Sequence, residues 1–502
     1  MSPGDLDIVV LVGAAVLLAA VAAVRISTRA GLPSLLVYLA IGLALGESGL
    51  GLGFEDAELT QVLGTVALAV ILAEGGFTTR WQDVRPVAPR AVVLATLGVL
   101  VSVGVTSTLA WLVLDVDART AIVLGAVASS TDAAAVFSVL RRLPIRPRLR
   151  ATVEAESGFN DPPVIILVTV VTSDAWDRGG VLTIAGQIGY QLAGGVLVGL
   201  LVALAGARLL AHSALPASGL YPLATLAIVF LGFAVAGMAG ASPLMAVYVA
   251  GLVLGDARLP HRAATDSFVE GLAWLSQIGL FVLLGLLASP DRLAAALPTA
   301  LIVGAALTLV ARPLSVVACL TPFRVPWRDQ AFVSWAGLRG AVPIVLATIP
   351  MSMGLPGAER VFDVVFLLVV LFTLVQAPTL PWVARATGAA VPLDARDLGI
   401  DSAPLEDLDA ILLQFSVPPG SRLAGVEVGE LRLPPGAVLS LLLHDGDLVV
   451  PTHRTVLRAG DHALVATDRA HHHEIEARLR AVSRAGRLAR WYAVPQRPVG
   501  NS

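Results

Sequence analysis

Ionisable side chains stand directly before a long apolar run in this sequence. Glu154, Glu156 and Asp161 are carboxylates, and the apolar run follows at residues 164–171. Ionisable groups at membrane depth are costly, so they face a bundle interior or a water-filled cavity and are functional by default. Desolvation there disfavours the charged form of a carboxylate, so a proton or a cation can each neutralise it. The chemistry predicted from this stretch is the binding of protons and small cations.

The spacing of these residues predicts a helix with one polar face. Glu154, Ser157 and Asp161 stand at i, i+3 and i+7, on one side of a helix, and Asn160 lies on an adjacent face. Pro162 removes a backbone donor and crowds the carbonyl one turn earlier, so we expect a kink or break beside Asp161. A freed carbonyl beside a carboxylate is a seat for a small cation.

A second polar cluster lies within another apolar segment, at Ser129, Ser130, Thr131 and Asp132. One interpretation is an interrupted helix in which the Thr131 carbonyl and the Asp132 carboxylate line an ion cavity. The alternative is a structural aspartate that accepts hydrogen bonds from the neighbouring hydroxyl groups. Glu74, at the end of a third apolar segment, is open to a similar pair of interpretations, as part of the site or as an interfacial acid.

Arg339 stands alone among apolar and small residues and needs a carboxylate partner at membrane depth. Glu156 and Glu154 are the candidates for that partner. The nearby Gly340 and Pro343 predict a second broken helix in the second half of the chain. Two broken helices in corresponding halves are typical of transporters built from two inverted repeats. We interpret Arg339 as a structural residue that holds the site in shape.

Bulk composition places the chain in the membrane. It has 502 residues, of which 56% are hydrophobic and only 14% are charged, whereas soluble domains carry roughly 25% charged residues. The net charge of −3 argues against a nucleic-acid partner. A single cysteine, Cys319, allows no intramolecular disulfide. Histidines 471–473 suit a metal tract or a solvated helix start, and without accompanying cysteines we predict the latter and no metal site.

Hydropathy predicts about 13 membrane spans of roughly 20 residues each. Arginines cluster in the loops after odd-numbered spans, which by the positive-inside rule puts the N-terminus outside and the C-terminus in the cytoplasm. We therefore predict a multi-pass protein of the plasma membrane. The spans fall at residues 7–25, 32–52, 57–76, 89–115, 119–140, 150–172, 181–211, 219–239, 243–256, 266–288, 293–319, 329–350 and 359–385.

Polar residues take over after Ala390 and predict a small soluble α/β domain. An Asp-Gly hairpin signal at 445–446 joins two of its strands, and Asp468 is a helix-capping candidate. The expected strands are 411–417, 438–443, 448–450 and 462–466, and the expected final helix is 471–492. The predicted divisions are a transmembrane domain (1–390), a linker (391–407), the small domain (408–468), and a terminal helix and tail (469–502).

Three segments in this order, 129–137, 156–162 and 337–343, resemble the signatures of the monovalent cation:proton antiporter-1 family. The resemblance extends over residues 7–390. The Asn160-Asp161-Pro162 sequence is similar to the potassium/proton antiporter branch of that family, the NhaP/CvrA type. Segments 416–425 and 450–461 are similar to the TrkA-C domain, the C-terminal domain of potassium-conductance regulators (RCK).

The resemblance implies an all-α membrane fold of inverted repeats, NhaA-like, and a secondary active antiporter rather than an enzyme. It implies exchange of K⁺ for H⁺ at a buried aspartate, with Na⁺ as the alternative cation and with no cofactor. It also implies a homodimer and cyclic di-AMP as the candidate ligand of the C-terminal domain. Its implied residue roles are a proton or cation carrier at Asp161, cation ligands at Asp132, Ser157 and Thr131, a water-linked acid at Glu74, a brace at Asn160, and a pair between Glu156 and Arg339.

Functions of other classes fit less well. A cation channel needs a Thr-Val-Gly-Tyr-Gly filter, which the sequence lacks. An intramembrane protease using Asp132 and Asp161 is disfavoured by the flanking Asn160 and Pro162 and by the number of spans. For the C-terminal domain, a sensor of a cytosolic ligand and a purely structural dimerisation module stay open. Pro163, which departs from the branch pattern, predicts a larger helix break.

Overall fold

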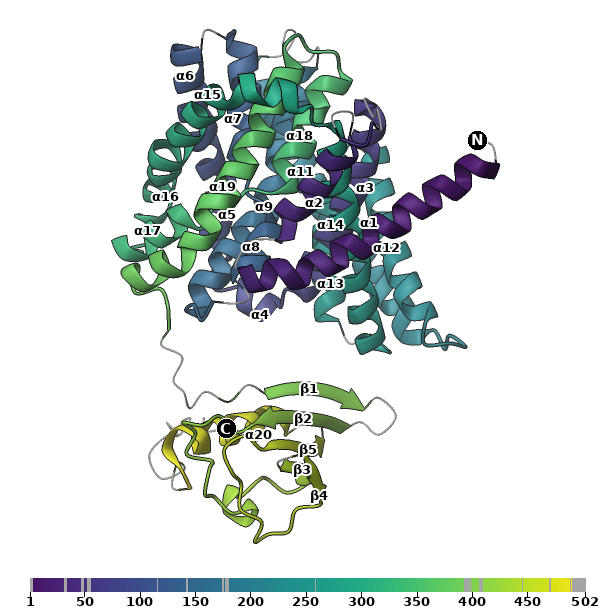
Figure 1. Cartoon of the computed structure of the whole chain (residues 1–502), viewed down its shortest axis with the longest axis vertical. Coiled ribbons are helices and arrows are strands. Elements are labelled where there is room, and N and C mark those ends of the chain that lie inside the picture. The colour runs from purple at the N-terminus through teal and green to yellow at the C-terminus, as the bar shows by residue number, and fades with distance from the viewer. Residues whose placement is uncertain are drawn as a thin grey trace, which may run out of the picture. The chain divides into compact units, whose positions relative to one another are not determined.

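The structure is a computed structural model in which the chain forms two compact units, Met1–Val391 and Pro392–Ser502 (Figure 1). Each unit is described by itself. The residues described are 3–30, 34–46, 49–51, 56–114, 116–140, 143–173, 176, 180–257, 259–391, 398, 400–405, 410–444, 446–468, 471–487 and 489.

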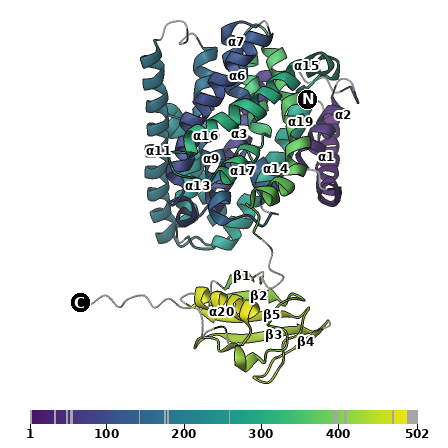
Figure 2. The ribbon, with the colours of Figure 1, turned by 90° about the vertical axis from the view of Figure 1, so that its left-hand side faces the viewer.

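The first unit is a bundle of helices, and every predicted span overlaps a helix or a pair of half-helices. Seven of the described helices are long and apolar enough to cross a membrane, and shorter apolar helices accompany them. In two views the helices gather into one bundle with α1 at its edge (Figures 1 and 2). Eight of its described helices are α1 (Pro3–Ala30), α2 (Ser34–Leu45), α3 (Ala57–Thr78), α4 (Trp81–Val84), α11 (Val181–His212), α12 (Leu220–Met238), α13 (Pro243–Asp256) and α14 (Arg262–Leu287).

Two sets of helices repeat the same plan. Each set has a long helix containing a π-helical segment, then an interrupted helix, then a long helix with two internal prolines. This is the arrangement expected of inverted repeats. The first set is α5 (Ala88–Val93), η1 (Leu94–Gly98), α6 (Val99–Leu114), α7 (Ala118–Ser129), α8 (Ala133–Leu140) and α9 (Pro147–Thr172). The second is α15 (Pro290–Ala306), η2 (Leu307–Ala311), α16 (Arg312–Leu320), α17 (Trp327–Trp335), α18 (Ala341–Ser352) and α19 (Ala358–Thr387).

Helix α9 is continuous through both of its internal prolines, so of the two predicted forms, a kink or a break beside Asp161, the break is wrong. Pro162 and Pro163 cannot donate to the carbonyls one turn earlier, but close packing holds the helix together. The ring of Tyr248 on α13 lies against Gly158, where a Cβ would come within 2.7 Å of it. The same ring meets Phe159 edge to face, with centroids 5.4 Å apart.

The end of α19 is fastened to the segment that precedes α9. The amide of Arg146 donates to the Ala389 carbonyl at 3.1 Å, and the amide of Val391 donates to the Pro144 carbonyl at 2.7 Å. Ile145 and Ala390 form an antiparallel bridge between these two bonds. The last described residues of the first unit are therefore tied to the start of α9.

The second unit is a five-stranded antiparallel sheet in the order β1-β2-β5-β3-β4. Its core includes Phe415, Val465 and Leu479. Figure 2 shows α20 lying along the sheet. The elements are β1 (Ile400–Leu405), β2 (Ala410–Ser416), η4 (Val428–Leu431), β3 (Val438–His444), β4 (Asp447–Val449), β5 (His462–Asp468) and α20 (His472–Ala485).

The four predicted strands of this unit all form, with ends shifted by at most two residues. Strand β1 was not predicted and occupies part of the segment 391–407 that the sequence suggested as a linker. Its polar residues and Pro404 interrupt the pattern of apolar residues by which a strand is predicted. An edge strand tolerates both. The terminal helix is shorter than expected, since Gly486 at a φ of 79° ends it. Asp445 of the predicted hairpin and residues 490–502 lie outside the described residues.

Candidate functional site

The two interrupted helices meet at their interruptions. The amide of Asp132, between α7 and α8, donates to the carbonyl of Leu338, between α17 and α18, at 3.0 Å. The carboxylate of Asp132 accepts the amide of Ala341, the first residue of α18, at 2.5 Å. A Cβ on Gly340 would come within 2.0 Å of that carboxylate, so only glycine permits this approach. The predicted pair of broken helices is confirmed.

Charged side chains at this crossover lie at the helix ends that suit them. The Asp132 carboxylate lies at the N-terminus of α18, where the helix dipole favours an anion. The Arg339 guanidinium donates to the Ala128 carbonyl near the C-terminus of α7, at 3.1 Å, where a cation is favoured. Both side chains are only 1% exposed. Asp132 thus has a structural partner in a backbone amide of the other repeat.

Asp161 faces the crossover from α9. Its Oδ1 atom accepts a hydrogen bond from the Ser130 hydroxyl at 2.9 Å, while its Oδ2 atom is buried and has no hydrogen-bond partner among the described residues. The side chain is 1% exposed. A buried carboxylate oxygen without a donor is costly unless a proton or a cation meets it.

Two further oxygen atoms on α9 are buried and find no hydrogen-bond partner in the part of the chain that the structure describes. The amide of Asn160 donates to the Thr131 hydroxyl at 2.5 Å, which leaves its Oδ1 atom unpaired. The hydroxyl of Ser157, one turn before Asp161, is fully buried and also unpaired. Together with Asp161, these residues supply hard oxygen atoms, which are the ligands that hard cations prefer.

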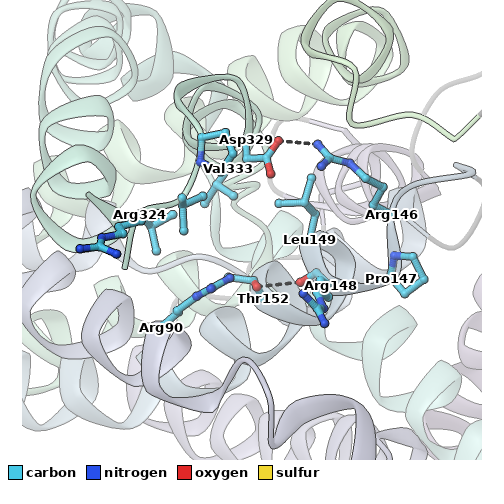
Figure 3. A pocket seen from close by; sticks show the side chains of 12 residues that line it. Arg90, Arg146, Pro147, Arg148, Leu149, Thr152, Arg324, Asp329 and Val333 are labelled. Atoms are coloured by element: carbon cyan, nitrogen blue, oxygen red, sulfur yellow. Dashed lines mark hydrogen bonds and ion pairs between the residues drawn. The ribbon is translucent and has the colours of Figure 1, made fainter. Parts of the chain in front are cut away.

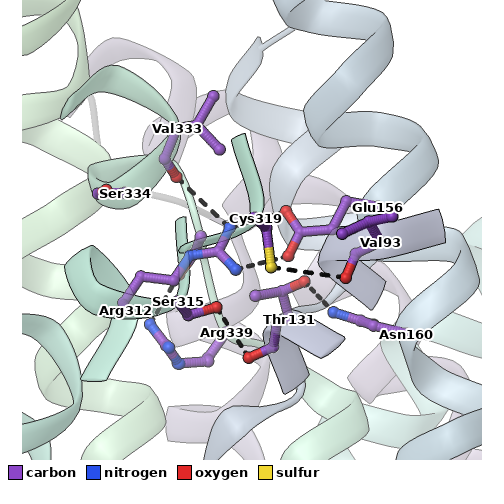
Figure 4. A network of polar contacts seen from close by, with 12 residues as sticks. Val93, Thr131, Glu156, Asn160, Arg312, Ser315, Cys319, Val333, Ser334 and Arg339 are labelled. Atoms are coloured by element: carbon purple, nitrogen blue, oxygen red, sulfur yellow. Dashed lines mark hydrogen bonds and ion pairs between the residues drawn. The ribbon is translucent and has the colours of Figure 1, made fainter. Parts of the chain in front are cut away.

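The predicted pair between Glu156 and Arg339 is wrong. The partner of Glu156 is Arg312 at the start of α16, which donates to both carboxylate oxygens at 2.5 and 2.7 Å (Figure 4). Arg339 instead donates to the carbonyls of Ala128 and Gly337. A guanidinium can satisfy itself on carbonyls freed by a helix break, which is why Arg339 needs no carboxylate.

Arg312 was not among the site residues predicted from the sequence, although its position within an apolar segment could have identified it. It interrupts the apolar run of the predicted span 293–319, and by the rule applied to Asp132 an intramembrane arginine is a functional candidate. Ser130 was noticed only as part of its motif, and the structure places its hydroxyl on Asp161. The partner of each residue comes from a segment far away in sequence, which spacing alone does not reveal.

The two π-helical segments lie beside this buried pair. Ser315, three residues after Arg312, donates to the Gly98 carbonyl in η1 at 2.8 Å. The same face of α16 carries Cys319, whose thiol lies 3.6 Å from the Val93 carbonyl. π-Helical segments free carbonyls from the regular helix pattern and are frequent at functional sites.

Glu74 is the predicted site residue that α3 contributes, and α3 packs against α18 and α8. It stands on α3, four residues before the end of that helix, and is half-buried. Its neighbours Gly75 and Gly76 are buried, and Gly76 lies tightly against the backbone of α13 at Tyr248. The water-mediated contact on which its role depends stays a prediction.

Comparison with known proteins decides the family. Residues 16–386 match the family described as sodium/hydrogen exchanger, transmembrane, and residues 412–480 match the TrkA-C domain. The chain belongs to the sodium/hydrogen exchanger family. It is therefore a transporter rather than an enzyme.

Members of the family resemble the chain along most of its length. The K(+)/H(+) antiporter NhaP2 of Shewanella oneidensis is 33% identical over 468 residues, covering 90% of this chain and 79% of that protein. The K(+)/H(+) antiporter NhaP of Alkalimonas amylolytica is 34% identical over 478 residues, covering 92% and 81%. The Na(+)/H(+) antiporter NhaS2 of a Synechocystis species is 27% identical over 368 residues, covering 70% and 66%.

A solved structure shares the fold. The sodium proton antiporter MjNhaP1 of Methanocaldococcus jannaschii at pH 8 aligns with a TM-score of 0.65, covering 75% of this chain and 98% of that one. The identity is 23%, so the likeness concerns the fold alone. It confirms the predicted antiporter architecture of the membrane unit.

Proposed function

We propose that the chain exchanges K⁺ for H⁺ across the plasma membrane by competition of the two ions for Asp161. The observation that carries the proposal is the buried, unpartnered Oδ2 atom of that aspartate. It needs a proton or a cation, and one carboxylate cannot hold both at once. If the loaded site changes its exposure only when neutralised, the two ions are exchanged obligatorily.

The ligand set follows from the unpaired oxygens. Asp161, Asn160 and Ser157 contribute side-chain oxygens from α9, and the Thr131 region closes the site from the first interrupted helix. Asp132 holds α18 in place through its bond to Ala341 and adds negative potential at the crossover. Glu74 reaches the site through water in this proposal.

The choice of K⁺ follows the relatives named as K(+)/H(+) antiporters, which are more similar to this chain than the relative named as a Na(+)/H(+) antiporter. Cavity size and ligand number set the selectivity between these ions. Exchange of one cation for one proton would be electroneutral. Current recorded on a solid-supported membrane under a cation gradient would contradict that stoichiometry.

The decisive experiment measures exchange in proteoliposomes that contain a pH-sensitive dye. K⁺ and then Na⁺ are added to the wild type, to Asp161→Asn, and to the control Asp291→Asn, which neutralises an exposed carboxylate on α15. We expect a K⁺ response in the wild type and in the control, and none in Asp161→Asn. Retained exchange in Asp161→Asn would remove this residue from the mechanism, and a response to Na⁺ alone would correct the cation.

We propose that the N-terminus is outside and that the second unit is cytoplasmic, on the basis of the arginine-rich loops. In this proposal the second unit is a sensor that regulates exchange, and cyclic di-AMP is its candidate ligand. The match to the TrkA-C domain supports a regulatory role. Deletion of residues 400–502 should change the pH or ligand dependence and spare basal exchange. Unchanged regulation would favour the alternative, a structural module that holds a homodimer together.

A further inference from the structure

A cavity of about 610 Å³ opens between α5, α9, α16 and α17, in the first unit (Figure 3). Its inner wall is apolar and includes the buried side chains of Leu149, Leu320 and Val333. Four arginines from three segments also line it: Arg90 on α5, Arg146 and Arg148 at the start of α9, and Arg324 between α16 and α17. The volume lies in the range of small-molecule sites.

The charge of this cavity is strongly one-sided. Asp329 is the one carboxylate among its lining residues, and it is already paired with Arg146. Within the described part of the chain, Arg90, Arg148 and Arg324 form no ion pair. Among the described residues, these three positive charges have no counter-charge. A lining with this excess of positive charge attracts an anion.

The backbone around the cavity also suits an anion. Helices α9 and α17 both begin at its wall, and neither start has a side-chain cap. The N-termini of helices carry partial positive charge. Arg324 has a φ of 54°, a left-handed conformation that is uncommon for a residue other than glycine. Arg324 lines the cavity from this left-handed turn.

We propose that this cavity binds the phosphate group of an anionic ligand, either a membrane lipid or a small soluble phosphate. Arginine is suited to phosphate because its planar fork donates two parallel hydrogen bonds. Trp327, next to the lining residue Pro326, is 72% exposed, and exposed tryptophans concentrate at the level of lipid headgroups. Basic pockets between membrane helices are typical headgroup sites. The proposal does not depend on which cation the protein transports.

An anionic ligand in the cavity would link helices that meet near the buried ion pair of Glu156 and Arg312. Val333, which lines the cavity, accepts a hydrogen bond from Arg312 on its carbonyl at 3.4 Å. Thr152 lines the same cavity one turn before Glu156 on α9. A ligand held by arginines of α5, α9 and the α16–α17 connection therefore stabilises the packing around Glu156 and Arg312.

The test measures thermal unfolding of the full chain in detergent. Cys319 is the single cysteine and is fully buried, so a fluorogenic thiol reagent reports when the membrane unit unfolds. One arm titrates cardiolipin against phosphatidylcholine in mixed micelles, and the other titrates inorganic phosphate against chloride at equal ionic strength. The variant combines Arg90→Gln with Arg324→Asn, because asparagine tolerates the left-handed conformation. Arg148→Gln is a second variant in case the first is poorly produced.

The matched control combines Arg208→Gln with Arg385→Gln, which removes two exposed arginines outside the cavity. We expect a stabilising shift in the wild type and in the control. In the cavity variant the apparent affinity should fall by about tenfold or more for each arginine removed. A shift with cardiolipin alone assigns a lipid headgroup, and a shift with inorganic phosphate assigns a soluble ligand. The proposal is overturned if neither probe shifts the wild type, or if the cavity variants respond as the control does.

Discussion

Arg312 holds both carboxylate oxygens of Glu156, at 2.5 and 2.7 Å, where the two side chains are only 5% and 1% exposed. The pair joins α16 of the second repeat to α9 of the first, the helix that carries Asp161. A pair this deeply buried costs much free energy to desolvate. Replacing both residues and replacing only one of them should therefore change the stability differently.

Arg312→Gln should lower the free energy of unfolding by about 3–5 kcal/mol, because it leaves Glu156 charged and buried without a partner. Thermal unfolding followed through the Cys319 thiol measures the loss. The control replaces both partners, Glu156→Leu with Arg312→Met, and should recover most of the stability. A single variant as stable as the wild type would show that the pair contributes little.

Gly340→Ala should disrupt the crossover, since the new Cβ would lie 2.0 Å from the Asp132 carboxylate. The carboxylate must then leave the Ala341 amide, and loss of a charge-assisted hydrogen bond costs about 1.5–3 kcal/mol. We expect reduced thermal stability and loss of exchange. Gly279→Ala is the matched control, because nothing lies within 4 Å of its added Cβ. Equal behaviour of the two variants would contradict the role assigned to Gly340.

Arg339→Ala should lower stability, since its guanidinium bonds the Ala128 and Gly337 carbonyls and lies over the Phe372 ring at 5.4 Å. Arg339→Lys should recover only part of the loss, because lysine lacks the planar fork that reaches two carbonyls at once. Unfolding temperatures of the two variants provide the measurement. A stable but inactive Arg339→Ala protein would instead place this residue in the transport step.

Asp117 caps the first half-helix, α7, by accepting the amide and the hydroxyl of Thr120. These hydrogen bonds hold the pKa of Asp117 below its usual range. Because the folded pKa lies below the unfolded one, the stabilisation is present at neutral pH and lost as the pH falls through the folded value. Asp117→Ala should cost about 1 kcal/mol, and Asp117→Asn should cost less but lose this pH dependence. Unfolding temperatures between pH 7 and pH 3 test both statements.

Local sequence signals predicted much of the architecture. The spans, the breaks near Asp132 and Arg339, and the strands after Ala410 follow from hydropathy, from intramembrane charge and from turn residues, which act over a few positions. The edge strand β1 escaped because its six residues include a proline and polar side chains. Its strand form depends on pairing with β2.

The sequence singled out residues that lie together at the crossover, but not their partners. Asp161, Asn160 and Thr131 meet at the crossover, yet the choice of Arg312 over Arg339 for Glu156 depends on three-dimensional packing of α16 against α9. The break expected at Pro162 failed for a similar reason. Tyr248, from a helix distant in sequence, packs against Gly158 and supports α9 where its own hydrogen bonds are missing.

The bridge between segments 144–146 and 389–391 has a mechanical consequence. Two backbone hydrogen bonds join residues 389 and 391, which follow α19, to residues 144 and 146, which precede α9. Tension on the chain that leaves α19 is shared between α19 and the first residues of α9, instead of ending at α19 alone. A pull on residue 391 therefore reaches the helix that carries Asp161 as well as α19.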